Sequence, residues 1–177
     1  PGPVVLAVLP GARSPDAGPS TATPTVEEVS VDLADDSRVR LVEFEEPEVG
    51  DVDITQQDVL VAVGRGISNE ANLEVAEELA DAFGGAVCGS RPVIDQGWLP
   101  LMRQVGKSGA TVKPRLYVAA GISGAPEHVE GMRDAEMTVA VNTDADAPIF
   151  SVADYGIVDD ATDVLEALAE AVRKRKG

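Results

Sequence analysis

Gln104-Val-Gly-Lys-Ser-Gly109, followed after a short gap by Arg115-Leu-Tyr-Val-Ala-Ala-Gly-Ile-Ser-Gly-Ala-Pro-Glu-His128, is the stretch that decides the fold. A polar glycine loop leads into a short apolar strand, the strand ends on Gly-Ile-Ser-Gly, and a helix-like segment follows. This order is typical of a parallel α/β sheet that builds a phosphate cradle. Glycines let the backbone approach an anion, and unpaired N–H groups at the start of the next helix face it.

The tripeptide Gly106-Lys107-Ser108 resembles the end of a P-loop, but the residues before it do not fit that motif. A P-loop requires a glycine five positions before Gly106, where Leu101 stands, and no strand leads into the loop. The sequence therefore argues against a nucleoside triphosphatase.

The composition indicates an acidic protein of one domain, or of one domain and part of another. The chain has 177 residues, begins with Pro1 and carries a net charge of −17, from 31 acidic and 14 basic residues. The first residue favours a piece processed or excised from a longer polypeptide. The charge balance resembles that of halophilic proteins from high-salt cytoplasm, although an ordinary acidic protein has it too. Such a charge argues against nucleic acid and anionic membranes as partners.

Cysteine and histidine are each present once, as Cys88 and His128. One cysteine excludes an intrachain disulfide and a cysteine-based zinc site, and one histidine excludes a multi-histidine metal site. Cys88 falls in a short apolar run that predicts a packed thiol. No apolar run reaches the length of a membrane span and no signal peptide is visible, so we expect a cytoplasmic protein without membrane insertion.

Two regions differ in their hydrophobic pattern. Residues 1–50 predict a short β-rich segment, the end of a preceding domain, with strands at 3–9, 26–33 and 38–44. Residues 51–177 alternate between strands and helices and form the second predicted domain. The expected strands and extended segments there are 58–63, 86–89, 116–120, 137–141, 148–152 and 156–158.

Two amphipathic helices are expected in the second domain, at 69–83 and 160–174. The first presents Leu73, Ala76, Leu79, Ala80 and Phe83 on one face, and the second presents Val164, Leu165, Leu168 and Val172. The alternation predicts an α/β fold with a doubly wound parallel sheet, Rossmann-like, whose ligands bind at the carboxyl ends of the strands.

Polar residues gather just after the expected strands, as this rule for ligands predicts. Between Arg91 and Arg115 there are also five basic residues and one acid, Asp95, in an otherwise acidic chain. This basic segment is suited to a pyrophosphate, although Lys113 and Arg115 equally fit surface ion pairs. No catalytic triad or calcium loop can be built, and we predict neither catalytic nor metal-binding residues. His128 alone is more often structural, but its place after the glycine turn favours contact with a ligand.

Several of these blocks resemble a known family when they are taken together. Val63-Gly-Arg-Gly66, Gly89-Ser-Arg-Pro92, Gln104-Val-Gly106 with Ser108-Gly109, Gly121-Ile-Ser-Gly-Ala125 with His128, and Val141-Asn142 occur in the order of the electron transfer flavoprotein alpha subunit. Asp95-Gln-Gly97, Ala147-Pro-Ile-Phe150 and Ala153-Asp-Tyr-Gly-Ile157 continue the similarity. It covers residues 51–177, which are similar to the C-terminal FAD-binding domain of that subunit.

The resemblance implies an electron carrier rather than a substrate-converting enzyme. Its cofactor would be FAD, and its partners an electron transfer flavoprotein beta subunit, flavin dehydrogenases as donors and a quinone oxidoreductase or another acceptor. It places Arg65, Ser123 and Gly124 at the pyrophosphate, and Ser90 and Arg91 beside the flavin, where the cation can tune its potential. Ser108 would meet flavin N5 and His128 flavin O2. The full set of expected cofactor contacts is Arg65, Ser90, Arg91, Gln104, Val105, Gly106, Lys107, Ser108, Ser123, Gly124, Ala125, Pro126, Glu127, His128, Asn142, Asp160 and Ala161.

Two residues depart from the family pattern, and two other functions stay open. Lys107 and Glu127 stand where glutamine is common, and a glutamate near a pyrophosphate repels it unless it turns outward or pairs with a cation.

An NAD-binding or transhydrogenase-like domain of the same fold is one alternative, although Asn69 stands where its third motif glycine would be. A flavin-free interaction domain is the other.

Overall fold

The computed structural model describes residues 25, 27–30, 42 and 52–176. The expected strand at 3–9 and the domain boundary between residues 50 and 51 lie outside these residues. The expected strands at 26–33 and 38–44 lie largely outside them as well, and their few described positions have no regular secondary structure. The β-rich N-terminal segment therefore stays a prediction.

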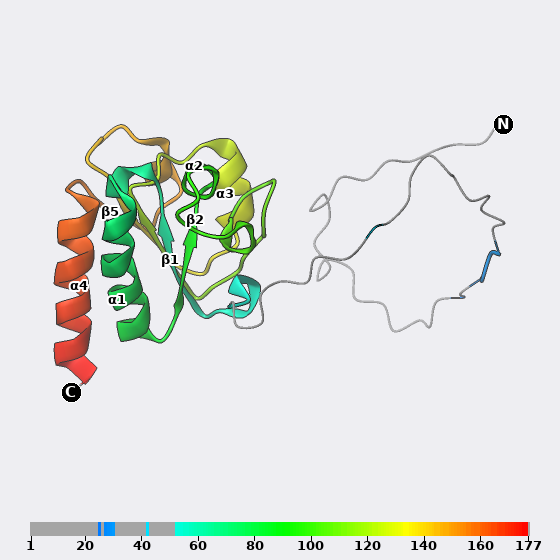
Figure 1. The fold of residues 1–177 in the computed structure, drawn as a ribbon, viewed down its shortest axis with the longest axis horizontal. Coiled ribbons are helices and arrows are strands. Elements are labelled where there is room, and N and C mark those ends of the chain that lie inside the picture. Colours follow the sequence, from blue (N-terminus) through cyan, green and yellow to red (C-terminus); the bar gives the residue numbers. More distant parts are fainter. Residues whose placement is uncertain (1–24, 26, 31–41, 43–51, 177) are drawn as a thin grey trace. The chain divides into compact units, whose positions relative to one another are not determined.

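Residues 52–176 form an α/β domain around a parallel five-stranded sheet, which confirms the predicted fold class (Figure 1). The strand order is β2-β1-β3-β4-β5. The strands are β1 (Val59–Val63), β2 (Ala86–Gly89), β3 (Leu116–Ala120), β4 (Thr138–Val141) and β5 (Tyr155–Ile157).

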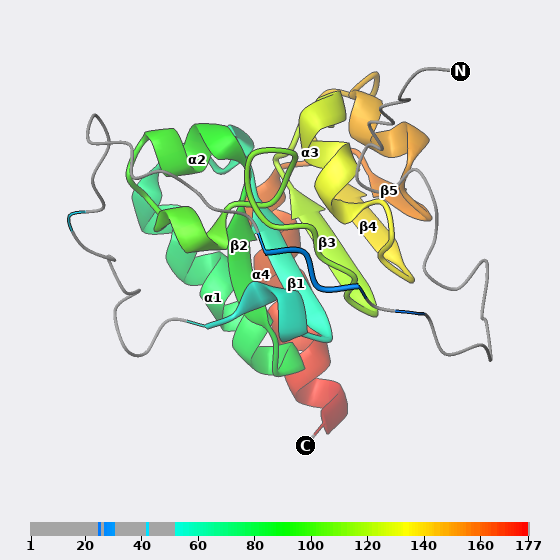
Figure 2. The ribbon, with the colours of Figure 1, turned by 90° about the vertical axis from the view of Figure 1, so that its right-hand side faces the viewer.

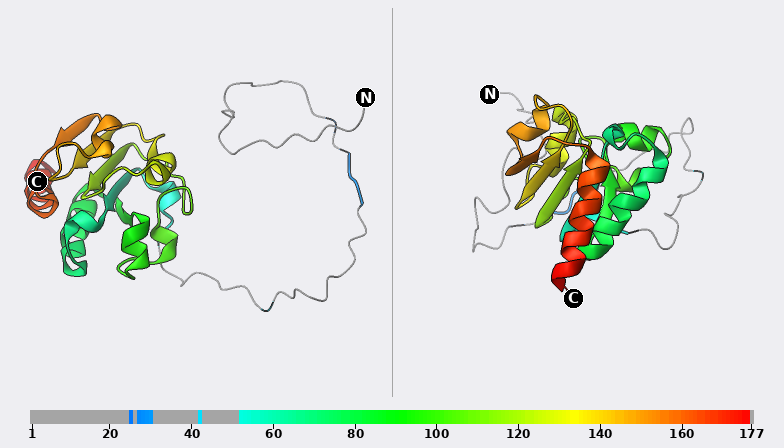
Figure 3. Two further views of the ribbon diagram at one scale, coloured as in Figure 1. Left: turned by 90° about the horizontal axis from the view of Figure 1, so that it is seen from above. Right: turned by 90° about the vertical axis from the view of Figure 1, so that its left-hand side faces the viewer.

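Helices cover both faces of this sheet. Figures 1 and 3 show α1 and α4 side by side along one face, and Figure 2 shows α3 in front of the opposite face. The α-helices are α1 (Leu73–Phe83), α2 (Arg91–Asp95), α3 (Pro126–Met132) and α4 (Ala161–Lys176). Short 3₁₀ turns complete the described part: η2 (Ile54–Gln56), η3 (Arg65–Ile67), η4 (Glu70–Asn72), η5 (Leu101–Arg103) and η6 (Pro148–Ser151).

The apolar strands supply two cores, one on each face, because successive side chains of a strand point to opposite faces. Val61 and Val63 pack towards α1 and α4, together with Leu165 of α4. Leu60 packs on the other side with Tyr117, the largest fully buried side chain. This second core is closed by α3 and by loops, which brings polar loop residues close to buried strand side chains.

The strand order reverses between β1 and β3, and the two chain segments that leave these strands meet there. The N–H of Gly64 donates to the carbonyl of Ala120 at 2.9 Å, and that of Gly66 to the carbonyl of Gly121 at 3.0 Å. In doubly wound sheets this switch point is where a ligand binds. The fold therefore locates the candidate site at this end of β1 and β3.

Two expectations about local structure need correction. Residues 148–152 are not extended, because Pro148 opens the 3₁₀ turn η6, whose first turn suits a fixed proline φ and buries Ile149. The helix expected at 69–83 begins with the separate turn η4, capped by the Asn69 side chain, and becomes α-helical only at Leu73. Short apolar runs and helix starts are the features that periodicity defines least.

Candidate functional site

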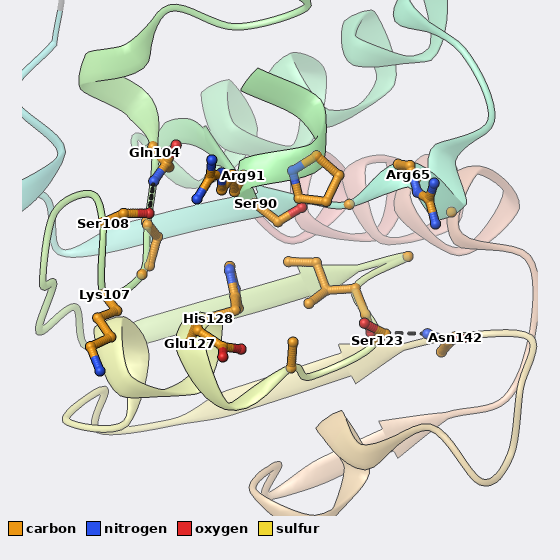
Figure 4. Close-up of a pocket in the computed structure, with 18 residues that line it drawn as sticks. Arg65, Ser90, Arg91, Gln104, Lys107, Ser108, Ser123, Glu127, His128 and Asn142 are labelled. Atoms are coloured by element: carbon orange, nitrogen blue, oxygen red, sulfur yellow. Dashed lines mark hydrogen bonds between the residues drawn. The ribbon is translucent and has the colours of Figure 1, made fainter. Parts of the chain in front are cut away.

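A pocket of about 530 Å³ opens at the switch point between β1 and β3. Figure 4 shows its two sides, with Arg65, Ser90 and Arg91 on one and Ser123, Glu127 and His128 on the other. The loop that carries Gln104 and Ser108 closes one end. The volume lies in the range of small-molecule and cofactor sites.

Thirteen of the seventeen expected contact residues line this pocket. They are Arg65, Ser90, Arg91, Gln104, Val105, Gly106, Lys107, Ser108, Ser123, Ala125, Glu127, His128 and Asn142. Segments separated by more than seventy positions in the sequence thus meet around one cavity. Gly124, Pro126, Asp160 and Ala161 do not line it, so their contact with a ligand stays a prediction.

Two glycine turns, at 64–66 and 121–124, meet at the pocket, which Gly64, Gly66 and Gly121 line. Gly121 and Gly124 have positive φ values of 64° and 87°, which side-chain-bearing residues rarely adopt. A Cβ on Gly121 would lie 2.6 Å from the Cα of Gly66, and a Cβ on Gly64 would collide with the Gly121 carbonyl. The absence of side chains here lets the two turns approach one another, and the N–H groups of Gly64, Gly66 and Gly121 are taken up by backbone hydrogen bonds.

Ser108 is held by a buried neighbour. The Gln104 side-chain amide donates a hydrogen bond of 2.9 Å to the Ser108 hydroxyl oxygen. Gln104 is only 3 % exposed, whereas Ser108 is exposed. Because the hydroxyl oxygen accepts this bond, its proton remains available to a ligand in the pocket.

His128 approaches the pocket from α3 and has one ring nitrogen occupied and one without a partner. Its Nε2 lies 2.9 Å from the Tyr117 hydroxyl, while Nδ1 is buried and makes no hydrogen bond. Burial lowers the pKa of His128 to about 4, and the nearby Val105 backbone opposes this weakly. The ring is therefore neutral at pH 7.

The charges around the pocket are mixed. Arg65 and Lys107 are exposed, and Arg91 makes an exposed ion pair of 3.4 Å with Asp95 of the same helix. Glu127 is exposed as well, and no ion pair joins its carboxylate to Lys107 in the described part of the chain. Their backbones do meet, since the Lys107 N–H donates to the Glu127 carbonyl at 2.8 Å.

Only two members of the basic segment, Arg91 and Lys107, reach the pocket. The Arg103 guanidinium instead donates to the Val87 carbonyl at 3.3 Å. Lys113 and Arg115 lie elsewhere. The segment therefore reaches the pocket through these two residues alone, and their contact with an anion stays a prediction.

Two further expected contacts hold neighbouring loops in place. The Asn142 amide donates to the Ile122 carbonyl at 2.9 Å, and its oxygen accepts from the Asp144 N–H at 2.9 Å (Figure 4). The Asp160 carboxylate accepts from the backbone and the hydroxyl of Thr162, which lowers the pKa of Asp160. Asn142 thus supports the turn after β3, and Asp160 caps the start of α4.

Sequence reasoning omitted five residues that line the pocket: Gly64, Gly66, Pro92, Gly121 and Ile122. All five belong to the strand-end motifs already recognised in the sequence, so the signal was present and only the flanking glycines and apolar residues were left out. Tyr117 was also missed. It reads as an ordinary strand residue, and only the fold reveals that its hydroxyl meets His128.

These groups suit a ligand that combines an anionic part with a flat, hydrogen-bonding part. The Arg65 side chain carries the positive charge that an anion requires, and the Ser108 hydroxyl and the His128 ring are groups that hydrogen-bond to polar ring atoms. Among the described residues, no group of three or more histidine, cysteine, aspartate or glutamate residues could hold a metal ion.

Comparison with known proteins identifies similar sequences. Residues 53–133 match the family model described as the electron transfer flavoprotein FAD-binding domain. The chain is 47 % identical to protein FixB of Clostridium saccharobutylicum over 148 residues, which are 82 % of this chain and 44 % of that protein. It is 44 % identical to the electron transfer flavoprotein subunit alpha of Megasphaera elsdenii over 168 residues, which are 93 % of this chain and 49 % of that protein.

A third relative is the acryloyl-CoA reductase electron transfer subunit beta of Anaerotignum propionicum, 51 % identical over 128 residues, 71 % of this chain and 35 % of that protein. The chain spans about half the length, or less, of these relatives. No helix in the described residues is both long enough and apolar enough to cross a membrane.

Proposed function

Because this chain carries the FAD-binding domain of the electron transfer flavoprotein alpha family, we propose that it binds FAD non-covalently and serves as an electron carrier. The observation that carries the proposal is the pocket at the switch point, where two glycine turns face a buried histidine nitrogen without a partner. A glycine cradle fits a pyrophosphate, and an unpaired buried nitrogen fits a polar ring atom.

Each group has a part in holding the cofactor under this proposal. Arg65, Ser123 and the turn at Gly124 bind the pyrophosphate. Ser108, oriented by Gln104 at 2.9 Å, donates its hydroxyl proton towards flavin N5. His128 meets flavin O2 with its unpaired nitrogen.

Arg91 is proposed to tune the flavin. Its side chain is 68 % exposed beside Asp95, so the ion pair is weak and exchanges readily for a ligand. A cation beside the ring stabilises negative charge that gathers there on reduction. FAD supplies the redox chemistry, and the chain's own residues bind it, orient it and set its electrostatic surroundings.

The remaining assignments concern the larger assembly. We propose an electron transfer flavoprotein beta subunit as the direct partner, flavin dehydrogenases as electron donors and a quinone oxidoreductase or another acceptor, in the cytoplasm. They rest on the family, since the chain spans about half of its relatives. Asp160 and Ala161 are proposed to lie towards the AMP half of FAD.

The test is to purify the chain gently, alone and together with a beta-type subunit, and to record visible spectra. We expect flavin absorbance in at least one preparation and saturable FAD binding in a fluorescence titration of the stripped protein. An Arg65→Ala variant is expected to bind FAD less tightly, while Arg133→Ala, which changes an exposed arginine outside the pocket, serves as its control.

The same titration separates the alternatives. Preferential binding of NAD over FAD would support the NAD-binding or transhydrogenase-like domain. Binding of neither dinucleotide, with or without the partner subunit, would support a flavin-free interaction domain and would overturn the proposal.

A further inference from the structure

Behind the unpaired nitrogen of His128 lies a buried row of side chains that leads away from the pocket. The Tyr117 hydroxyl is 2.9 Å from His128 Nε2, and the Cys88 thiol interacts with the same hydroxyl from β2. Tyr117 and Cys88 are completely buried, and His128 is 6 % exposed. These side chains come from β2, β3 and α3, and β1 lies between β2 and β3 in the sheet.

We propose that Tyr117 is a positioning residue that fixes the tautomer of His128, so that a neutral imidazole presents its Nδ1–H as a hydrogen-bond donor to the pocket. The proposal rests on the proposed function for the identity of the ligand. The contact between Tyr117 and His128 is present without any ligand. His128 would then act on the ligand as a directed donor without a full positive charge.

The direction of the hydrogen bonds follows from the chemistry of the three groups. A phenol has one proton to donate, and an imidazole nitrogen is a much better acceptor than a sulfur atom. The Tyr117 O–H therefore donates to Nε2. With a donor at Nε2, the only proton of the neutral ring must be on Nδ1.

The surroundings keep every proton in place. Burial raises the pKa of Cys88 to about 12 and that of Tyr117 well above its usual value, so both remain protonated at neutral pH. The reverse arrangement would point the Tyr117 proton at a sulfur atom and turn a bare Nδ1 lone pair towards the pocket. That arrangement exchanges a strong acceptor for a weak one, and it would repel the oxygen of a carbonyl or a phosphate.

His128 is the only histidine of the chain, so its tautomer can be measured directly. The experiment is a long-range ¹H–¹⁵N correlation spectrum of the ¹⁵N-labelled, ligand-free chain at pH 7. We expect the Nδ1–H pattern, with the Tyr117 hydroxyl proton correlated to Nε2. An Nε2–H pattern would overturn the proposal, and this measurement needs no variant.

A pair of variants then tests the part of Tyr117. In Tyr117→Phe we expect the excess of the Nδ1–H form to be lost, because the donor that keeps the proton away from Nε2 is removed. Tyr155→Phe, on the exposed edge strand, should leave the spectrum unchanged. A folded Tyr117→Phe protein that kept the wild-type tautomer would show that Tyr117 does not set it.

Adding FAD separates this inference from the proposed function. If FAD binds at this site, the Nδ1–H resonance should shift and exchange more slowly with water, because the proton gains an acceptor. Absence of FAD binding would refute the proposed cofactor but leave the tautomer result standing. FAD binding to a chain with the Nε2–H tautomer would support the proposed cofactor and would refute the proposed role of Tyr117.

Discussion

Gln104 and Ser108 are joined by a hydrogen bond of 2.9 Å in which the buried amide donates to the exposed hydroxyl. The bond turns a serine on a glycine loop into an oriented donor, since the hydroxyl proton must point elsewhere. The sequence Gly-Lys-Ser-Gly does not reveal this orientation, because the donor, Gln104, lies before Gly106 in the chain.

Replacing Ser108 should therefore weaken the cofactor's binding without unfolding the chain. We expect Ser108→Ala to raise the FAD dissociation constant by about three- to tenfold, the equivalent of one hydrogen bond of about 1 kcal/mol. Fluorescence titration measures it, and Thr111→Ala, outside the pocket, is the matched control. Equal affinities for the two variants would contradict the assignment of Ser108.

Glu127 lies at the rim of the pocket without an ion pair to Lys107, so its charge should oppose an anionic ligand. We expect Glu127→Gln to bind FAD about two- to fivefold more tightly, an exposed charge effect below about 1 kcal/mol, and the gain to shrink at high salt. Glu130→Gln, on the same helix but outside the pocket, provides the control. A gain shared by both variants would point to net charge rather than to position.

The sheet could be predicted because each of its inner strands is a continuous apolar run. Residues 60–63 and 117–120 bury both of their faces, and a parallel sheet between helices is the arrangement that permits this. The predicted strand ends are therefore close to the observed ones. The prediction of an extended segment at 148–152 was wrong. Five residues with a leading proline fit either an extended segment or a 3₁₀ turn, and the observed turn buries Ile149.

The polar residues of the site could be predicted from their places after the strands, but the hydrogen bonds between their side chains could not. Polar residues after β1, β2 and β3 converge because the strands are parallel, and this much follows from chain order. The pairing of Gln104 with Ser108 and of Tyr117 with His128 depends on where the loops fold back over the sheet. The Gln104–Ser108 bond spans only four positions but depends on the conformation of the loop, and the Tyr117–His128 contact joins a strand to a helix through tertiary packing.

The two glycine turns should be intolerant of side chains. In Gly121→Ala the new Cβ would meet Gly66 and the residue would keep a positive φ, so we expect a loss of about 2–4 kcal/mol in unfolding free energy. Gly84→Ala also has a positive φ but open space around it, and should lose only about 1 kcal/mol. Urea unfolding of both variants measures the difference, and equal losses would mean that the contact with Gly66 adds nothing.

The neutral state of His128 makes the stability of the chain depend on pH. Its pKa is lowered from 6.5 to about 4 in the folded chain, so between these values the unfolded chain binds more protons. The free energy of unfolding should therefore fall as the pH drops from about 6.5 to about 4, by about 3 kcal/mol in total. In His128→Gln this contribution should be absent. The difference between the two urea-unfolding curves across that window isolates it, because the carboxylates titrate alike in both proteins.

Asp160 is both the cap of α4 and an expected contact of the cofactor, and two substitutions separate these roles. Its carboxylate accepts from Thr162 and from the Asp163 N–H at 3.4 Å, so Asp160→Ala should lower the unfolding free energy by about 1 kcal/mol. Asp160→Asn should retain most of the stability, because asparagine caps helices as well as aspartate does. Thermal unfolding with FAD titration of both variants distinguishes the outcomes. Weaker FAD binding by a stable Asn variant would show that the carboxylate itself reaches the cofactor, whereas unchanged binding would limit Asp160 to its structural role at the start of the helix.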